Sequence, residues 1–153
     1  MNKQPDFDVQ AAHSYFSAHC FNSAWDLIDK SDRSPEEDER MIQLNQASLW
    51  HWSQRVDCSD QSLSVGYWQA ARIHALLGQV GEARRYGQLS LQYSGQLEPF
   101  YRGYAYEALA RAEQVAGNKE KEQEFAAEAR RLAEMVSDAE EKKLLVDDLA
   151  GFG

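Results

Sequence analysis

The sequence predicts an all-α fold, an antiparallel α-α solenoid of about eight helices, from three observations. Alternating apolar and polar runs bounded by turns, the pattern typical of β-strands, do not occur in its 153 residues. Residues that cap helix N-termini, and glycines that end helices, punctuate the chain throughout. A pattern of aromatic, small and glycine residues also recurs 39 residues further along, at Gly78 and again at Gly117. Such self-similarity indicates stacked helical hairpins.

The first part of the chain predicts three helices, near residues 7–19, 22–30 and 35–56. Asn22 is a candidate N-cap for the second of them. The run Ser34-Pro35-Glu36-Glu37 places a serine at the N-cap, proline at the first helical position and glutamate at the third, which is a capping box. The only long loop is therefore expected at about 31–34.

Five more helices follow, near residues 61–77, 80–94, 99–116, 119–136 and 138–149. Gly78 and Gly117 end two of them as left-handed C-caps would. Pro99 suits a first helical turn, Asn118 is a candidate N-cap, and Ser137-Asp138-Ala139-Glu140 repeats the serine-to-glutamate capping spacing. Because no linker remains, residues 1–153 are expected to form a single helical-repeat domain.

The recurring pattern pairs equivalent residues of two helical units. Counted from each glycine, Tyr67, Ala71, Arg72 and Tyr86 align with Tyr106, Ala110, Arg111 and Phe125. These residues resemble the tetratricopeptide repeat family, in which an aromatic opens helix A, a small residue faces it, a glycine closes the helix and an alanine of helix B fills the gap. Ala83 fits that alanine in one unit, whereas Glu122 occupies its place in the next.

The resemblance covers residues 60–133 and, more weakly, 8–30. It implies repeat-like units at 8–30, 61–95 and 99–136, with the helix at 138–149 as a cap. The period exceeds the family's usual value of about 34 residues, so the helices must be longer. The predicted helix 35–56 disturbs the alternation. Either it packs outside the repeat, or the N-terminal segment is not a true repeat.

Charge and composition limit the partners. The net charge is −9 and the isoelectric point is about 4.9, so phosphate backbones and anionic membranes are repelled. No apolar run approaches the roughly 20 residues of a transmembrane helix, and no apolar signal region opens the chain, so a cytoplasmic location is expected. The segment 61–118 carries five Arg and four Glu and holds eight of the 17 aromatic residues. A binding region is therefore expected there.

Catalytic and metal-binding motifs are not found in the sequence. There is no glycine-rich phosphate loop, no G-x-S-x-G, no H-E-x-x-H and no C-x-x-C. His13 and His19 are six residues apart, so on one helix they point roughly 120° apart and would not share a metal. Cys20 lies in an apolar stretch and fits a buried core position. We therefore expect no enzyme activity, no metal and no cofactor; an enzyme using the His and Cys residues is the remote alternative.

The most informative residues are an aromatic and charged set in the middle of the chain: Trp68, Arg72, Tyr104, Glu107 and Arg111. Arg72 and Arg111 occupy equivalent repeat positions, which line up along the concave face of a solenoid. Two guanidinium groups beside aromatic rings suit a carboxylate or an extended acidic peptide. The simpler interpretation is that Glu107 pairs with Arg72 or Arg111 and holds the helices together.

The sequence thus favours a non-catalytic adaptor that binds a peptide or protein segment in a concave groove. A sensor of a small anionic ligand, using Arg72, Arg102 and Arg111, is the alternative from another class. The C-terminal segment carries Leu144, Leu145, Val146, Leu149 and Phe152. We expect it to pack over the last repeat or, as the second choice, to form a homodimer contact.

Overall fold

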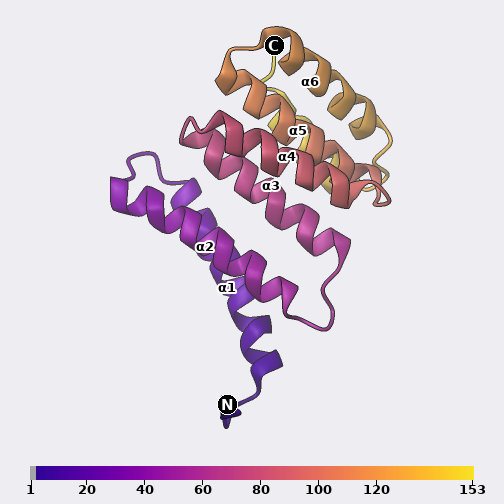
Figure 1. Ribbon diagram of the computed structural model, residues 1–153. Helices are drawn as coiled ribbons and strands as arrows, with labels where there is room; N and C mark the ends of the chain where they lie inside the picture. Colours follow the sequence, from indigo (N-terminus) through magenta and orange to yellow (C-terminus); the bar gives the residue numbers. More distant parts are fainter. Residues whose placement is uncertain (1–2) are drawn as a thin grey trace. The chain divides into compact units, whose positions relative to one another are not determined.

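The computed structural model describes residues 3–153, which form seven α-helices and no strand (Figure 1). They are α1 (Val9–Ile28), α2 (Pro35–Ser53), α3 (Asp60–Leu76), α4 (Val80–Ser94), α5 (Pro99–Ala116), α6 (Lys119–Glu134) and α7 (Ala139–Leu149). The all-α prediction is confirmed, but the expectation of two helices at 7–19 and 22–30 is wrong. That stretch is the single helix α1, since no Gly or Pro interrupts it and Asn22 lies within the helix rather than at a cap.

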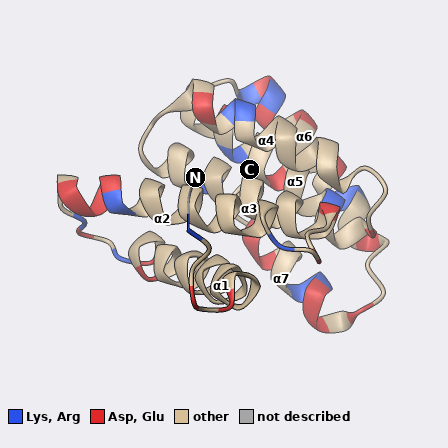
Figure 2. Cartoon of the chain, turned by 60° about the horizontal axis from the view of Figure 1, so that its bottom comes forward, with Lys and Arg blue, Asp and Glu red and all other residues tan. Residues whose placement is uncertain are grey.

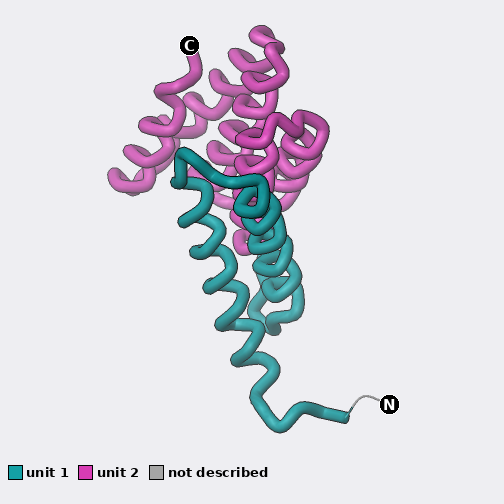
Figure 3. Tube along the Cα trace, turned by 90° about the vertical axis from the view of Figure 1, so that its left-hand side faces the viewer, with its two compact units in different colours: residues 1–59 teal, residues 60–153 magenta. Residues whose placement is uncertain are grey.

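The chain divides into two compact units, residues 1–59 and 60–153, coloured separately in Figure 3. Unit 1 is the hairpin of α1 and α2. The Ser48 hydroxyl donates to the Ser17 carbonyl at 2.7 Å, and the Gln10 amide donates to the Gln54 carbonyl at 3.0 Å. Because residues near the start of α1 meet residues near the end of α2, the two helices are antiparallel. Helix α2 is therefore the partner of α1. With one helix instead of the two expected at 7–19 and 22–30, α2 is no longer an unpaired extra helix.

Unit 2 contains α3 to α7. Consecutive helices pack together from α3 to α7, and α5 also packs against the two alternate helices α3 and α7. No helix within residues 3–153 is long and apolar enough to span a membrane. Charged segments mark α7 in Figure 2, whereas α3, which carries only Asp60 and Arg72, is drawn largely in tan.

The 39-residue spacing reappears in the turns of unit 2. Gly78 and Gly117 adopt φ angles of +71° and +76°, the left-handed conformation in which a Cβ would be strained. Each is followed by the same helix-ending hydrogen bond. The Gln79 N–H donates to the carbonyl five residues back at 2.8 Å, and the Asn118 N–H does so at 3.0 Å. Both glycine C-caps are thus confirmed.

The aromatic positions of the pattern also match. The rings of Tyr67 and Tyr86 lie 6.0 Å apart across α3 and α4, and those of Tyr106 and Phe125 lie 6.2 Å apart across α5 and α6. Pairs that are equivalent in sequence are therefore equivalent in space.

Helix α7 covers the apolar faces of α5 and α6. Leu145, Leu149 and Phe152 are nearly inaccessible to solvent. They pack in one core cluster with small residues of the two helices, namely Ala110, Ala126, Ala129 and Ala133. The N-cap of α7 is Asp138, whose carboxylate accepts from the Glu141 N–H, and not Ser137. The predicted caps Ser34 and Asn118 are confirmed, each accepting a backbone N–H three residues on.

Candidate functional site

The five predicted site residues lie together between α3 and α5. Glu107 is fully buried at the centre of the group. Its Oε2 accepts the Trp68 indole N–H at 2.9 Å, and its Oε1 accepts the Arg111 Nε–H at 2.9 Å. The Arg72 Nη1 lies 3.9 Å from the same Oε1. The Trp68 and Tyr104 rings meet edge to face, with centroids 5.0 Å apart.

The helical spacing and the repeat together explain this convergence. Trp68 and Arg72 are four residues apart on α3, and Glu107 and Arg111 are four apart on α5, so each pair shares one helix face. The packing of α3 against α5 then brings those faces together. Both guanidinium groups consequently meet one carboxylate, the arrangement expected of an ion pair between helices.

The two arginines keep partial exposure. The side chains of Arg72 and Arg111 are 22% and 23% exposed, against 1% for Glu107. The Arg111 guanidinium also lies 5.5 Å from the centroid of the Phe152 ring. Arg102 lies elsewhere, close enough to Glu128 of α6 to lower the pKa of that carboxyl, although the main cause is the hydrogen bond that Arg131 donates. Arg72, Arg102 and Arg111 do not converge on one site.

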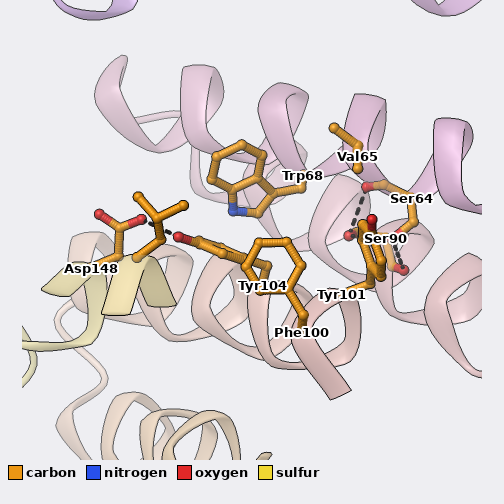
Figure 4. A pocket seen from close by; sticks show the side chains of 9 residues that line it. Ser64, Val65, Trp68, Ser90, Phe100, Tyr101, Tyr104 and Asp148 are labelled. Atoms are coloured by element: carbon orange, nitrogen blue, oxygen red, sulfur yellow. Dashed lines mark hydrogen bonds between the residues drawn. The ribbon is translucent and has the colours of Figure 1, made fainter. Parts of the chain in front are cut away.

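A pocket of about 330 Å³ lies next to the Glu107 cluster. Its lining residues come mainly from α3, α5 and α7: Ser64, Val65, Trp68, Ser90, Phe100, Tyr101, Tyr104, Leu144 and Asp148. Figure 4 shows Trp68 on one side, facing Phe100 and Tyr104, with Asp148 at one end and Tyr101 with the two serines at the other. Leu144 at the edge is 58% exposed, so the pocket is accessible from solvent.

Two predicted residues, Trp68 and Tyr104, belong to both the cluster and the pocket. The predicted site included none of the other seven lining residues. Phe100 and Tyr101 had a usable signal, because they stand beside Tyr104 in the first turns of α5. Leu144 and Asp148 had none, because their part in the pocket depends on how α7 folds back against α5.

Burial and carboxylates keep the pocket tyrosines protonated. Burial raises the pKa of Tyr104 far above its usual value, and the hydrogen bond to Asp148 adds to this effect. The Tyr104 hydroxyl donates to the Asp148 Oδ2 at 2.7 Å. Burial also raises the pKa of Tyr101, with smaller contributions from Glu141 and Glu98. Negative charge therefore lies at several points around the rings.

The histidines and cysteines of unit 1 form no comparable site. The Nδ1 atoms of His13 and His51 lie 2.9 Å apart, while His19 stacks on Tyr15 instead. Burial raises the pKa of the Cys20 thiol, which keeps it protonated. Within residues 3–153, no group of three or more His, Cys, Asp or Glu side chains is placed to hold a metal ion.

We found no match to this chain among protein-family models, curated proteins or solved structures. The aromatic pocket and the buried Glu107 cluster therefore carry the functional assignment by themselves.

Proposed function

We propose that this protein is a non-catalytic interaction module that binds a peptide or protein segment at the aromatic pocket of unit 2. The proposal rests on which helices supply the residues that line the pocket. Alternate helices α3, α5 and α7 supply most of them, and alternate helices form the inner face of a helical solenoid. A partner segment lying along that face would place one side chain in the pocket.

The packing of unit 2 supports a solenoid related to tetratricopeptide repeats. Each helix contacts the next along the chain, and α3, α5 and α7 contact one another in turn. The matched glycine turns and ring pairs, 39 residues apart, indicate two copies of one hairpin. Residues 60–94 and 99–134 are the two copies in this proposal, and α7 covers the second.

The pocket favours a protein segment over a small anion. Its volume of about 330 Å³ is at the lower end for ligand pockets, about 300–1,000 Å³, which suits one inserted side chain. Two of the three arginines on which an anion sensor would depend, Arg72 and Arg111, are paired with Glu107. Arg102 lies near Glu128 instead. The charged residue among those lining the pocket is Asp148, which repels carboxylates. We therefore propose a segment that presents no acidic side chain to this pocket.

A displayed library of random peptides tests the proposal, with the full-length chain as bait. Val65→Trp should fill the pocket from α3 and abolish enrichment of the peptides selected by the unmodified chain. Val115→Trp is the matched control, since Val115 is 42% exposed on α5 and lies outside the pocket lining. Loss of enrichment in Val65→Trp alone supports the proposal. Equal enrichment by all three proteins, or none by the unmodified chain, contradicts it.

A further inference from the structure

Four aromatic rings form walls of the pocket at steep angles to one another. The planes of Trp68 and Tyr104 are inclined by 69°, those of Phe100 and Tyr104 by 82°, and those of Phe100 and Tyr101 by 80°. Neighbouring centroids are 5.0–5.2 Å apart. All four side chains are half-buried, so each keeps part of its surface for a ligand. Rings set at such angles present both faces and edges to a common space.

The charges around this space are negative. The face of an aromatic ring carries the negative part of its quadrupole and attracts cations. Asp148 lies at one end of the pocket (Figure 4). Its Oδ2 accepts the Tyr104 hydroxyl, and its Oδ1 accepts no hydrogen bond from the described residues 3–153. Glu98 and Glu141 act on the Tyr101 hydroxyl from outside the lining.

The nearest positive charges are compensated. Arg72 and Arg111 both pair with Glu107, the carboxylate that also accepts the Trp68 N–H. Arg72 has the smallest influence among the groups that act on the Tyr104 hydroxyl, and the carboxylates of Asp148 and Glu107 outweigh it. A cation in the pocket would therefore meet ring faces and one carboxylate.

The pocket offers few hydrogen-bond acceptors to such a cation. Ser64 and Ser90 are almost inaccessible to solvent, and their hydroxyls donate to each other's backbone carbonyls, at 3.2 and 3.0 Å. A lysine ammonium has three N–H groups, each of which loses water on entry and needs an acceptor. Each methyl group replaces one of those N–H groups and keeps the charge, and trimethylation removes all three, so methylation lowers the desolvation cost and suits an aromatic enclosure.

We propose that the pocket formed by Trp68, Phe100, Tyr101, Tyr104 and Asp148 is an aromatic cage for the methylated ammonium group of a lysine in a partner protein. This inference rests on the proposed function, because the lysine arrives on a bound protein segment. The net charge of −9 agrees with a basic partner.

Capped amino-acid amides test the cage on the full-length chain. The probes are N-acetyl-trimethyllysine amide, its neutral analogue with carbon in place of the ammonium nitrogen, N-acetyl-lysine amide with a free side chain, and choline. Chemical-shift changes of the ¹⁵N-labelled protein give each Kd. We expect the trimethyllysine probe to bind about tenfold tighter than the neutral analogue, and tighter than the unmethylated lysine.

Asp148→Asn should reduce the preference for the trimethyllysine probe over the neutral analogue without abolishing it. The amide oxygen would still accept the Tyr104 hydroxyl and the ring faces would still attract the cation, but the side chain would carry no charge. Asp147→Asn is the matched control, since the adjacent Asp147 is paired with Lys143 on the surface of α7, and it should leave the affinity unchanged. Tyr101→Leu removes one ring and should weaken the charged probe more than the neutral one. Circular dichroism checks that each variant folds.

The possible failures are distinguishable. Equal binding of the charged and neutral probes overturns the cage but leaves a pocket for an apolar side chain, so the proposed function survives. If choline binds more tightly than the trimethyllysine probe, the claim that the ammonium group belongs to a lysine of a partner protein is wrong. If no probe binds but Val65→Trp still abolishes enrichment of the displayed peptides, the cage is wrong and the proposed interaction module stands. If the peptides also fail, both proposals fall.

Discussion

At the scale of single residues, Glu107 is a buried carboxylate at the centre of the cluster beside the pocket. It is fully buried, yet it serves two guanidinium groups and one indole N–H. A buried carboxylate that accepts hydrogen bonds from Trp68 and Arg111 restricts the rotamers of both. The cluster thereby holds Trp68 as a wall of the pocket, which makes Glu107 a positioning residue.

We expect Glu107→Ala to lower the free energy of unfolding by about 3 kcal/mol, because it removes the buried carboxylate that Arg72 and Arg111 both face. Urea unfolding followed by circular dichroism measures the change. Glu82→Ala is the control, since its ion pair with Arg85 is half-exposed on both sides, and it should cost at most about 1 kcal/mol. Similar losses in the two variants would show that the cluster is not structurally important.

Glu113 makes a second prediction at this scale. Two hydrogen bonds from Arg84, at 2.7 and 2.8 Å, hold the pKa of Glu113 below its ordinary value of 4.5. The unfolded chain therefore takes up the proton first as the pH falls. The stabilisation is complete above pH 4.5 and is lost as the pH falls through the folded pKa.

Glu113→Gln should flatten this acid loss of stability. Urea unfolding of wild type and variant between about pH 3 and 7 tests the expectation. Glu124→Gln, at an exposed pair with Lys121, should follow the wild-type curve. A variant curve parallel to the wild type at every pH would contradict the assignment to Glu113.

Site residues can be predicted from the sequence where helical spacing and the repeat register determine their positions. Trp68, Arg72, Glu107 and Arg111 were found because helical spacing and the repeat register place them on facing helix sides. Asp148 was not, because sequence spacing says nothing about which earlier helix α7 folds against. The sequence favours the ion pair of the arginines with Glu107 over a ligand site but does not decide between them, because the burial of Glu107 is not readable from spacing.

At the scale of elements, α7 is held by a few large apolar side chains. Leu145 is inaccessible to solvent, and its neighbour Val146 is 45% exposed. A Cβ added at Gly103 of α5 would lie 2.5 Å from the Leu145 Cδ2. A methyl group at position 103 would therefore force the Leu145 side chain to move.

Leu145→Ala should destabilise the protein by about 2–5 kcal/mol, because it opens a cavity between α7 and α5. Val146→Ala, one residue further on the exposed face, should change stability by less than about 0.5 kcal/mol. Thermal melts of the two variants give the comparison. A Leu145→Ala variant as stable as Val146→Ala would mean that α7 is not docked as described.

The hairpin of α1 and α2 should respond to pH. Burial, and then the charge of His13, lower the pKa of His51 below its ordinary value of 6.5. The unfolded chain binds that proton more readily, so stability should fall as the pH drops below 6.5 towards the folded pKa. The short Nδ1 contact also needs one ring to donate and the other to accept.

Thermal melts of the whole protein between about pH 5 and 8 test this expectation. In wild type, the melting temperature should decrease below pH 6.5, and His51→Gln should reduce that decrease. His19→Gln, at an exposed ring stacked on Tyr15, serves as the control and should behave as wild type. A His51→Gln profile identical to wild type would contradict the role of the histidine pair.

Element boundaries were predictable where chemistry forces them. Gly78, Gly117 and Pro99 mark helix ends in the structure as in the sequence, because left-handed backbone and the missing proline N–H leave few alternatives. The break expected before Asn22 was wrong for the converse reason. Asn acts as an N-cap only where the chain leaves the helical conformation. The residues on both sides of Asn22 are helical, so α1 continues through it.

At the scale of the whole molecule, the division into two units has a direct consequence for folding. We expect residues 60–153, produced alone, to be helical and to melt cooperatively, since their helices pack extensively among themselves. Circular dichroism of the fragment is the measurement. A fragment without helical signal at 25 °C would show that the unit depends on residues 1–59. Val65→Trp in the same fragment should leave its helicity intact.

The distribution of tryptophan gives the second unit an optical reporter. Trp25, Trp50 and Trp52 belong to residues 1–59, whereas Trp68 is the only tryptophan in the sequence of residues 60–153. Its indole is both a wall of the pocket and a donor to a buried carboxylate. Fluorescence of the isolated fragment would therefore arise from one ring, whose emission wavelength follows the polarity at the pocket. Unlabelled compounds can therefore be screened against this unit by the shift of its intrinsic tryptophan emission.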